Sequence, residues 1–234
     1  MSALAPALSR SACGGVALRL GETTVVMRAS GALLIQQAQM LVVADLHLEK
    51  GSAYAARGQM LPPYDSAETL RRLAAEVAAT APRVLVLLGD SFHDGGGEGR
   101  LPPADEAMLV NLARGLTLIW VVGNHDRDGP KRLPGEVIHE MKIAGLRLRH
   151  EPCSSPAPGE LSGHLHPCAR IAGVGRRRCF ATDGERIVLP AFGAYAGGLN
   201  VRDPAFGGLF ARKPTAVTLG PRAEAVDWRK LSGD

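Results

Sequence analysis

The sequence has few cysteines, few aromatic residues and no long hydrophobic run. Four of its 234 residues are cysteines, and aromatic residues make up 4%. Cys13, Cys153, Cys168 and Cys179 show no Cys-x-x-Cys spacing, so we expect reduced thiols in a cytoplasmic protein, without a thiolate zinc site or a disulfide framework. No apolar stretch approaches the roughly 18 residues of a membrane span. The N-terminus also lacks an apolar segment of signal-peptide length, so neither membrane insertion nor export is expected.

The chain also lacks a strong charge of either sign. Its 27 basic and 23 acidic residues leave a net charge of +4, which is too small to indicate nucleic-acid binding by itself. The apolar fraction of 46% and the charged fraction of 21% are ordinary for a globular protein and exclude disorder and a coiled coil. We therefore expect one domain over residues 16–234, after a flexible segment over residues 1–15 that is rich in Ala, Ser, Pro and Gly.

The periodicity predicts strands at both ends of the chain and strand–helix alternation in the middle. A helix is predicted over residues 66–79, with Asp65 as N-cap and Glu68 completing a capping box, and a second over residues 104–114. Strands are predicted over residues 16–20, 23–27, 32–35, 40–44, 84–88, 118–122, 146–149, 179–181, 186–189, 217–219 and 223–226. This order favours an α/β (α+β layered) fold, with helices packed outside a pair of sheets.

Three of the buried strands end in polar residues. Residues 41–44 lead into Asp45-Leu46-His47, residues 84–88 into Gly89-Asp90, and residues 118–122 into Gly123-Asn124-His125-Asp126. Open α/β sheets bind ligands beyond the carboxyl ends of their strands, so we expect these clusters to meet in one site. Two further clusters follow, at His150 and at Gly163-His164-Leu165-His166.

Together these clusters supply seven potential metal donors, which are Asp45, His47, Asp90, Asn124, His150, His164 and His166. Oxygen and imidazole donors without thiolate favour Mn²⁺, with Fe and Zn²⁺ as alternatives. Seven donors exceed the need of one catalytic ion and match two ions that share a bridging carboxylate. In an extended segment, residues i and i+2 point to the same side, so Asp45 and His47 can converge on one ion.

In this order, the motifs resemble the signature of the calcineurin-like metallophosphoesterases. One bacterial branch, the ligase-associated DNA damage response endonucleases (PdeM), is similar over roughly residues 16–226. The stretches that carry this narrower resemblance are residues 44–51, 89–94, 150–152, 162–167 and 189–193. The resemblance implies the metallophosphoesterase fold, with two packed mixed β-sheets flanked by helices and the active site at the C-terminal ends of the strands.

The resemblance also implies a role for each residue. Asp45, His47 and His166 would bind one metal ion, Asn124, His150 and His164 the other, and Asp90 both. His125 would face the substrate, with Asp126 orienting its ring. A hydroxide that bridges the ions would attack phosphorus, and His125 would protonate the leaving group as general acid. The segment Ser91-Phe92-His93-Asp94 departs from the superfamily pattern and leaves the roles of His93 and Asp94 open.

The expected activity is hydrolysis of phosphodiester bonds, with DNA as the favoured substrate. Lys50, Arg57, His93 and Arg127 are the expected substrate contacts. A small-nucleotide phosphodiesterase, cyclic nucleotides included, is the main alternative because aromatic residues are scarce. A phosphomonoesterase such as a phosphoprotein phosphatase comes next. A scaffold that has lost its metals is disfavoured, since every expected ligand is present.

Other segments have two interpretations. Arg176-Arg177-Arg178 either contacts a phosphate backbone or is a solvated charge run on an edge strand. Gly95–Gly99 is expected to be a mobile loop near the mouth of the site. The resemblance further implies a functional association in DNA repair with a DNA ligase, a helicase and an exonuclease. The oligomeric state stays open, and a homo-oligomer is one alternative.

Overall fold

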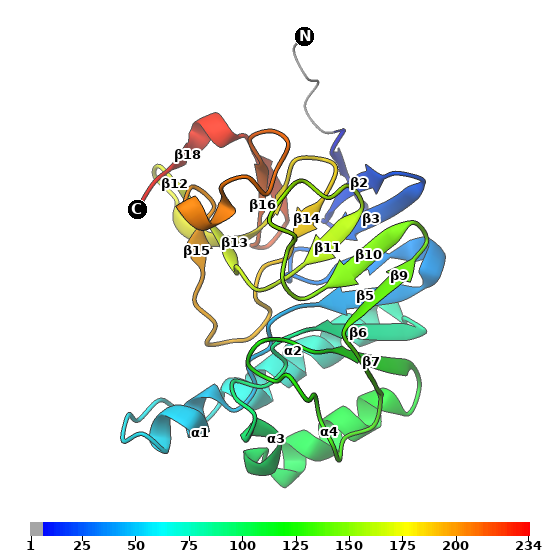
Figure 1. Ribbon diagram of the computed structural model, residues 1–234, viewed down its shortest axis with the longest axis vertical. Coiled ribbons are helices and arrows are strands. Elements are labelled where there is room, and N and C mark those ends of the chain that lie inside the picture. The colour runs from blue at the N-terminus through cyan, green and yellow to red at the C-terminus, as the bar shows by residue number, and fades with distance from the viewer. Residues whose placement is uncertain (1–6) are drawn as a thin grey trace.

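The computed structural model describes residues 7–234; residues 1–6, part of the predicted flexible segment, lie outside the described residues. Two mixed β-sheets are stacked on each other, and a layer of helices covers the outer face of the first sheet (Figure 1). The predicted pair of packed mixed sheets is confirmed. The α-helices lie on one side only, against the first sheet. Loops and short 3-10 helices cover the outer face of the second sheet.

Within the described residues, the first sheet has eight strands in sequence order. They are β1 (Ser9–Arg10), β2 (Val16–Leu20), β3 (Thr23–Met27), β4 (Leu33–Ile35), β5 (Met40–Val43), β6 (Val84–Leu88), β7 (Thr117–Val121) and β8 (Glu136–Ile138). The strands from β1 to β5 pair antiparallel, and those from β5 to β8 pair parallel. The parallel half places the carboxyl ends of β5, β6 and β7 at one edge.

The second sheet contains the C-terminal half of the chain. Its order is β15 (Leu199–Asn200), β12 (Pro167–Ile171), β13 (Gly175–Thr182), β14 (Ile187–Val188), β11 (Glu160–Ser162), β10 (Leu146–Arg149) and β9 (Glu140–Ile143). Three more strands join it, namely β16 (Thr215–Thr218) on β13, β17 (Glu224–Val226) on β16 and β18 (Leu231–Ser232) on β12. Strands β10, β11 and β14 pair parallel, so the segments after β10 and β11 leave the sheet at the same edge.

The side-chain alternation of the central strands explains the layers. In β5, Leu41 and Val43 point to the helices, whereas Met40 and Val42 point to the second sheet. The same alternation continues in β6 and β7, so both faces of each strand are buried, as their unbroken apolar runs predict. A core between the sheets and a core under the helices result.

Four α-helices and three 3-10 helices complete the described part of the chain. They are α1 (Lys50–Ala55), α2 (Asp65–Thr80), α3 (Gly97–Arg100), α4 (Pro103–Ala113), η1 (Gln36–Ala38), η2 (Pro204–Phe206) and η3 (Trp228–Lys230). Helices α2 and α4 bury Leu70, Leu73 and Leu109 against the first sheet. The helix α1 extends away from the body, at the lower left of Figure 1.

The predicted capping box on α2 is wrong. Asp65 is the first residue of the helix, Tyr64 occupies the N-cap position, and no side chain caps the helix there. The Asp65 carboxylate instead accepts a hydrogen bond of 3.0 Å from the Gly51 backbone N–H in α1. The Asp65 side chain therefore contacts the preceding helix α1 and does not cap its own helix.

Two more segments differ from the prediction. Ser9 and Arg10 pair with Ala17 and Val16, so the first strand starts before the predicted domain boundary at residue 16. Part of the glycine-rich segment Gly95–Gly99 forms α3, whose Glu98 accepts three backbone hydrogen bonds from residues 131–133. Among the described residues, no helix combines the length and the apolar character needed to cross a membrane.

Candidate metal centre

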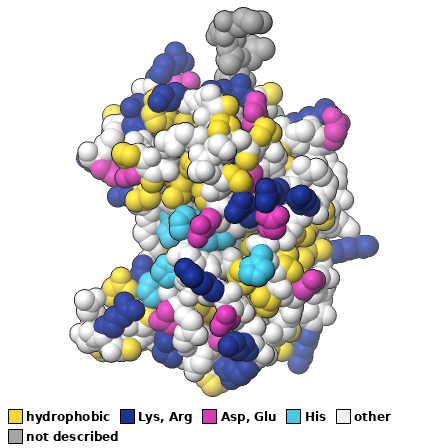
Figure 2. All heavy atoms as spheres, in the orientation of Figure 1, with side chains coloured by type: hydrophobic (Ala, Val, Ile, Leu, Met, Phe, Trp, Pro, Cys, Tyr) yellow, Lys and Arg dark blue, Asp and Glu magenta, His cyan; other side chains and the backbone are white. Residues whose placement is uncertain are grey.

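The polar clusters after β5, β6 and β7 do meet at one edge of the first sheet. Beyond β5, the segment Asp45–Leu48 continues alongside Gly89–Phe92, because the N–H groups of Asp45, His47 and Leu48 donate to the carbonyls of Gly89, Asp90 and Ser91. The segments after β10 and β11 of the second sheet bring His150, His164 and His166 to the same place. Figure 2 shows histidine side chains gathered in a notch between the upper part of the molecule and the lower left.

The backbone at this edge is left-handed at five of the predicted ligands. The angle φ is 54° at Asp45, 46° at His47, 47° at Asp90, 69° at His164 and 45° at His166. The expectation that Asp45 and His47 converge through an extended segment is therefore wrong, since a left-handed turn brings them together. Left-handed non-glycine residues are strained and need support from their surroundings.

One group of donors contains Asp45, His47 and His166. The Nε2 atoms of His47 and His166 are 3.2 Å apart, and His166 Nε2 lies 3.3 Å from Asp45 Oδ1. Asp45 is fully buried and His47 nearly so, whereas His166 reaches the surface. We call these three residues the first donor group.

The second donor group contains Asp90, His150 and His164, with Asn124 beside them. His150 Nε2 lies 3.0 Å from Asn124 Oδ1 and 3.3 Å from Asp90 Oδ2. His164 Nδ1 lies 2.9 Å from the same Asn124 oxygen. His164 and His166 thus point to different groups, and all seven predicted ligands lie in the two groups.

The geometry of both groups fits divalent ions. Ligand atoms about 2 Å from a shared ion lie about 3 Å apart at the angles of ordinary coordination, and the separations of 2.9–3.3 Å within the two groups are close to this value. Two ring nitrogens that face each other, as those of His47 and His166 do, satisfy a metal better than they satisfy each other. His150 Nδ1 faces the Leu88 carbonyl at 3.2 Å, so in the neutral ring this nitrogen carries the proton and Nε2 is the atom that can bind an ion.

The pKa values reflect burial and the close packing of opposite charges. Burial lowers the pKa of His47 to about 3 and also lowers the pKa of His164. Burial acts against charge at His150 and Asp90 too, but their mutual hydrogen bond prevails. It raises the pKa of His150 to about 9, with help from Asp45, and lowers the pKa of Asp90 to about 2.

Two glycines of the predicted motifs are required by close approach. A Cβ atom on Gly89 would lie 2.1 Å from His150 Nδ1, and one on Gly123 would lie 2.1 Å from Asp90 Oδ1. Any side chain at either position would displace a ligand. This explains why glycine precedes Asp90 and Asn124.

His125 lies beside both donor groups and belongs to neither, although its ring nitrogen also lies close enough to those of His47 and His93 for the three histidines to form a third possible metal cluster. Its Nδ1 is 2.7 Å from the His93 carbonyl oxygen, and its Nε2 is 3.9 Å from Asp90 Oδ2. Because a carbonyl only accepts, Nδ1 carries the proton. The side chain is 40% exposed, so Nε2 can be reached by a substrate.

Asp126 does not orient the His125 ring as predicted. Its buried carboxylate accepts hydrogen bonds from the backbone N–H groups of Ser91, Phe92 and Gly123, at 2.7, 3.2 and 2.9 Å. Burial raises the pKa of Asp126 to about 6, although these N–H groups favour the charged form. The carboxylate therefore links the loops after β6 and β7. The ring of His125 is oriented by the His93 carbonyl instead.

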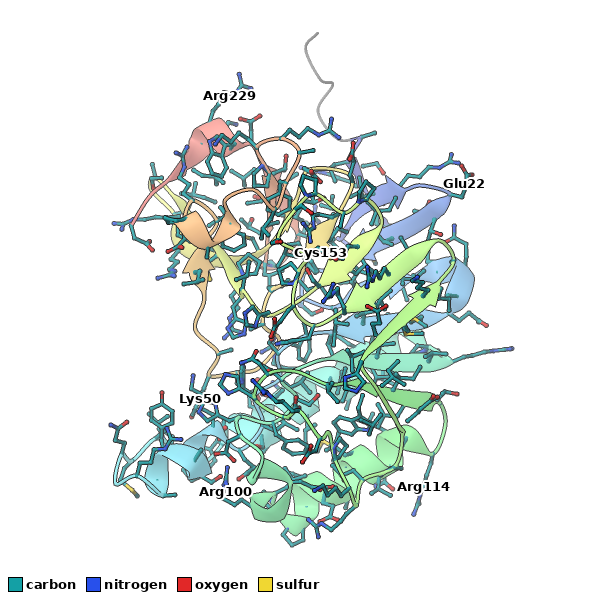
Figure 3. All side chains as sticks on the ribbon, in the orientation of Figure 1. Glu22, Lys50, Arg100, Arg114, Cys153 and Arg229 are labelled. Carbon is teal, nitrogen blue, oxygen red and sulfur yellow. The ribbon has the colours of Figure 1, made fainter. Side chains whose placement is uncertain are left out.

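The predicted substrate contacts surround the two groups. The His93 ring lies 5.7 Å from those of His47 and Tyr54, and its buried Nδ1 has no partner among the described residues. Burial and the nearby charges of Lys50 and Arg57 lower the pKa of His93. Lys50 Nζ donates to the Tyr195 carbonyl at 3.1 Å, so part of its hydrogen-bonding capacity is already used (Figure 3).

Arg127 is exposed and lines two hollows next to the donor groups. One, of about 440 Å³, includes Asn124 and His150, and the other, of about 390 Å³, includes Asn124 and His125. Each has room for a part of a substrate that extends from the metal centre.

Several supporting residues are not apparent from the sequence motifs. Asp94, whose role the sequence leaves open, pairs with Arg100, which also donates to Ser52 in α1. Arg72 and Arg178 donate to backbone carbonyls of the loop after β14. The arginine run at residues 176–178 is the sequence feature that points to Arg178. Nothing in the sequence distinguishes Arg72.

Comparisons with known proteins agree with this geometry. A sequence model of the calcineurin-like phosphoesterases matches residues 38–184. The crystal structure of nuclease MPE from Pseudomonas putida is similar with a TM-score of 0.70 and 26% identity, over 91% of this chain and 100% of that chain. The structure of Yfce, a phosphoesterase from E. coli, covers 68% of this chain and 82% of that chain at 17% identity, and its TM-score of 0.37 is too low for a comparison of sites. No curated protein matches the chain.

Proposed function

The chain belongs to the calcineurin-like phosphoesterase family and is a hydrolase; on this basis we propose that it cleaves phosphodiester bonds in DNA with two divalent ions. The observation that carries the proposal is the pair of donor groups, side by side, with the exposed imidazole of His125 at their edge. A phosphodiester bound across the two groups would have its leaving oxygen within reach of that imidazole.

In this proposal Asp45, His47 and His166 hold one ion, and Asn124, His150 and His164 hold the other. Asp90 contacts both, and its Oδ2 lies 3.3 Å from His150 Nε2 and 3.9 Å from His125 Nε2. Two ions held there would bring the pKa of a coordinated water to about 7 and offset charge on the phosphoryl oxygens. The donor set of three oxygen ligands and four imidazoles, without thiolate, favours Mn²⁺ over metals that prefer thiolate.

His125 is the general acid of the proposed reaction. With Nδ1 bonded to the His93 carbonyl, only Nε2 can exchange a proton with the substrate. A proton on Nε2 passes to the leaving oxygen as the P–O bond breaks. Such a transfer contributes about 10²–10⁴ to the rate.

The proposed substrate is DNA, for two reasons. The similarity to a nuclease extends over the whole of that protein. In addition, the charges of Lys50 and Arg57 act on His93, and Arg127 lines two hollows beside Asn124, so positive charge suited to a polyanion lies near the donor groups. The His93 ring lies 5.7 Å from the ring of His47, and a protonated ring nitrogen of His93 would donate a hydrogen bond to a phosphate oxygen bound there. Action in DNA repair with a ligase, a helicase and an exonuclease belongs to the same proposal and does not require direct contact between the proteins.

The test measures Mn²⁺-dependent cleavage of single-stranded, duplex and circular DNA beside a chromogenic phosphodiester and a monoester. The proposal requires cleavage of at least one DNA form, and of the diester, with loss of both in Asp90→Ala at saturating metal. Turnover that survives Asp90→Ala would contradict the metal mechanism. Activity on small esters alone would remove DNA as the substrate.

A small-nucleotide phosphodiesterase or a phosphomonoesterase is the second candidate. The hollows of about 440 and 390 Å³ beside Asn124 are of the size that holds a small ligand. Salt dependence separates the two candidates, because DNA binding weakens steeply as salt rises and mononucleotide binding does not.

A further inference from the structure

The loop Pro190–Gly198, which we call the strap, connects β14 with β15 and lies against the first donor group. It descends from the second sheet toward the helices (Figure 1), and Lys50 of α1 lies where the two meet (Figure 3). Its first half includes residues 190–193 of the segment 189–193, one of the sequence motifs without an assigned role.

Cationic side chains hold the carbonyl groups of the strap. The Arg178 guanidinium donates to the carbonyls of Ala191, Ala194 and Ala196, at 3.2, 3.0 and 2.8 Å. Three other cations hold one carbonyl each, namely Arg72 at Phe192, Lys50 at Tyr195 and Arg176 at Gly198. The planar fork of arginine suits several acceptors at once, so Arg178 holds more of the strap than the other cations do.

Backbone N–H groups in and next to the strap bind the segments that carry the first donor group. Phe192 N–H donates to the Ala44 carbonyl at 2.8 Å, and Gly193 N–H donates to the Asp45 carbonyl at 3.1 Å. Leu199, directly after the strap, donates to the His166 carbonyl at 3.2 Å. The backbone carbonyls of Asp45 and His166, two of the three residues in that group, therefore accept hydrogen bonds from the strap or from the residue after it.

The strap also packs directly against these segments, and no side chain would fit at two of its glycines. A Cβ atom on Gly193 would lie 2.1 Å from the Leu46 carbonyl oxygen, and one on Gly198 would lie 2.3 Å from the His166 carbonyl oxygen. Asp45 and His166 have left-handed backbones, which persist only where surrounding contacts hold them. A shift of the strap would be transmitted to both ligands.

We propose that Arg178 is a positioning residue for the first metal ion, acting through the strap on Asp45 and His166. It touches neither ion nor substrate. The second donor group depends on other supports, including the Leu88 carbonyl at His150. Asp45 also accepts a hydrogen bond from the backbone N–H of His164 in the second group, so loss of Arg178 should weaken the first ion more than the second, a difference between the sites that general destabilisation would not produce. The inference rests on the proposed two-ion site.

The experiment measures Mn²⁺ binding to Arg178→Met, which keeps the aliphatic part of the side chain. Equilibrium dialysis measures both dissociation constants, and electron paramagnetic resonance distinguishes a coupled ion pair from a single ion. Reference variants His47→Ala and Asn124→Ala identify the two sites. We expect the dissociation constant of the first ion to rise about 10–100-fold, as for losses of residues that support metal ligands, and that of the second to rise much less.

The matched control is Arg177→Met, at the neighbouring exposed position of β13; it should bind both ions as the wild type does. Arg178→Lys keeps the charge, but one ammonium cannot span three carbonyls, so we expect an intermediate loss. If Arg178→Met does not fold, Arg178→Lys provides the measurement. Unchanged affinity at the first site, or equal loss at both, would overturn the proposal. If the wild-type protein binds fewer than two ions, the proposed two-ion function is wrong, whatever the variants show.

Discussion

The imidazoles of the metal centre differ in what their second ring nitrogen contacts. His150 and His125 each direct Nδ1 at a backbone carbonyl, of Leu88 and of His93 respectively. Both rings are therefore fixed with Nε2 directed into the site. His47 has a buried Nδ1 without a partner among the described residues, so its orientation depends on its neighbours and on the ion.

The His125→Ala variant tests the general acid. For an ester with a poor leaving group, we expect kcat to fall about 10²–10⁴-fold. A nitrophenolate leaves without a proton, so the same variant should lose much less on a nitrophenyl ester. Metal content should be unchanged, since His125 lies in neither donor group. Equal losses on both esters would contradict the role.

Metal binding to the second group should release a proton. In the metal-free protein the pKa of His150 is raised to about 9, so the ring is protonated at pH 7 and must lose that proton to become a ligand. Affinity for the second ion should then rise by about tenfold per pH unit from pH 7 to pH 9. Above pH 9 the dependence should disappear.

Titration of Mn²⁺ in weakly buffered solution with a pH indicator measures this release. The first group is the internal control, because the pKa of His47 is lowered to about 3 and its ring is already neutral. Second-site binding that does not change with pH would show that His150 is neutral without metal.

At the scale of elements, buried arginines hold loops that have no regular structure of their own. Arg186 and Glu160 form an ion pair in which both side chains are 1% exposed. Arg186 also donates to the carbonyls of Cys153 and Ser155, just after the ligand His150, and to Leu209. The second sheet thereby anchors the segment between β10 and β11, as the strap is anchored by Arg178.

The Arg186→Met variant should lose about 3–5 kcal/mol of unfolding free energy, because Glu160 would remain as an unpaired buried charge. Adding Glu160→Gln should recover part of the loss. Urea unfolding measures both variants. The control is Arg147→Met, which breaks an exposed pair with Glu140 and should change the free energy of unfolding little. A loss at Arg186 no larger than this control would contradict the assignment.

The elements that periodicity predicted are those with an apolar face of their own. Strands β2, β3 and β6 have the predicted bounds, and α2 and α4 differ by one residue at each end. Short elements such as β8, β11, β15, β18 and α3 were missed. Each has between two and four residues and depends on pairing with a distant segment, which local patterns do not report.

At the scale of the whole molecule, the metal centre lies where both sheets contribute segments. Asp45, Asp90 and Asn124 follow strands of the first sheet, and His150, His164 and His166 follow strands of the second. Ions bound to both sets would link the two sheets. Binding should therefore stabilise the whole domain.

Calorimetry with excess chelator and with Mn²⁺ tests this link. At an ion concentration of about 100 times the dissociation constant, one ion adds about 2.7 kcal/mol. For a chain of this size this is a rise in the unfolding midpoint of about 5–10 °C. The double variant Asp45→Asn/Asp90→Asn should lose the rise. The same rise in the double variant would place the stabilising ions elsewhere.

The sequence by itself determined the layered fold, the strand ends that meet, and the residues gathered there. These follow from apolar runs with regular spacing and from polar residues directly after them, which are local properties of the chain. Only the tertiary structure decided that Asp126 binds three backbone N–H groups, that left-handed turns bring Asp45 and His47 together, and that Arg178 holds the strap. Asp126 reaches the N–H groups of Ser91 and Phe92, which lie 35 and 34 residues away, and Arg178 reaches a loop beyond the next strand. These partners, and the contacts that support the left-handed turns, exist only after the strands have packed.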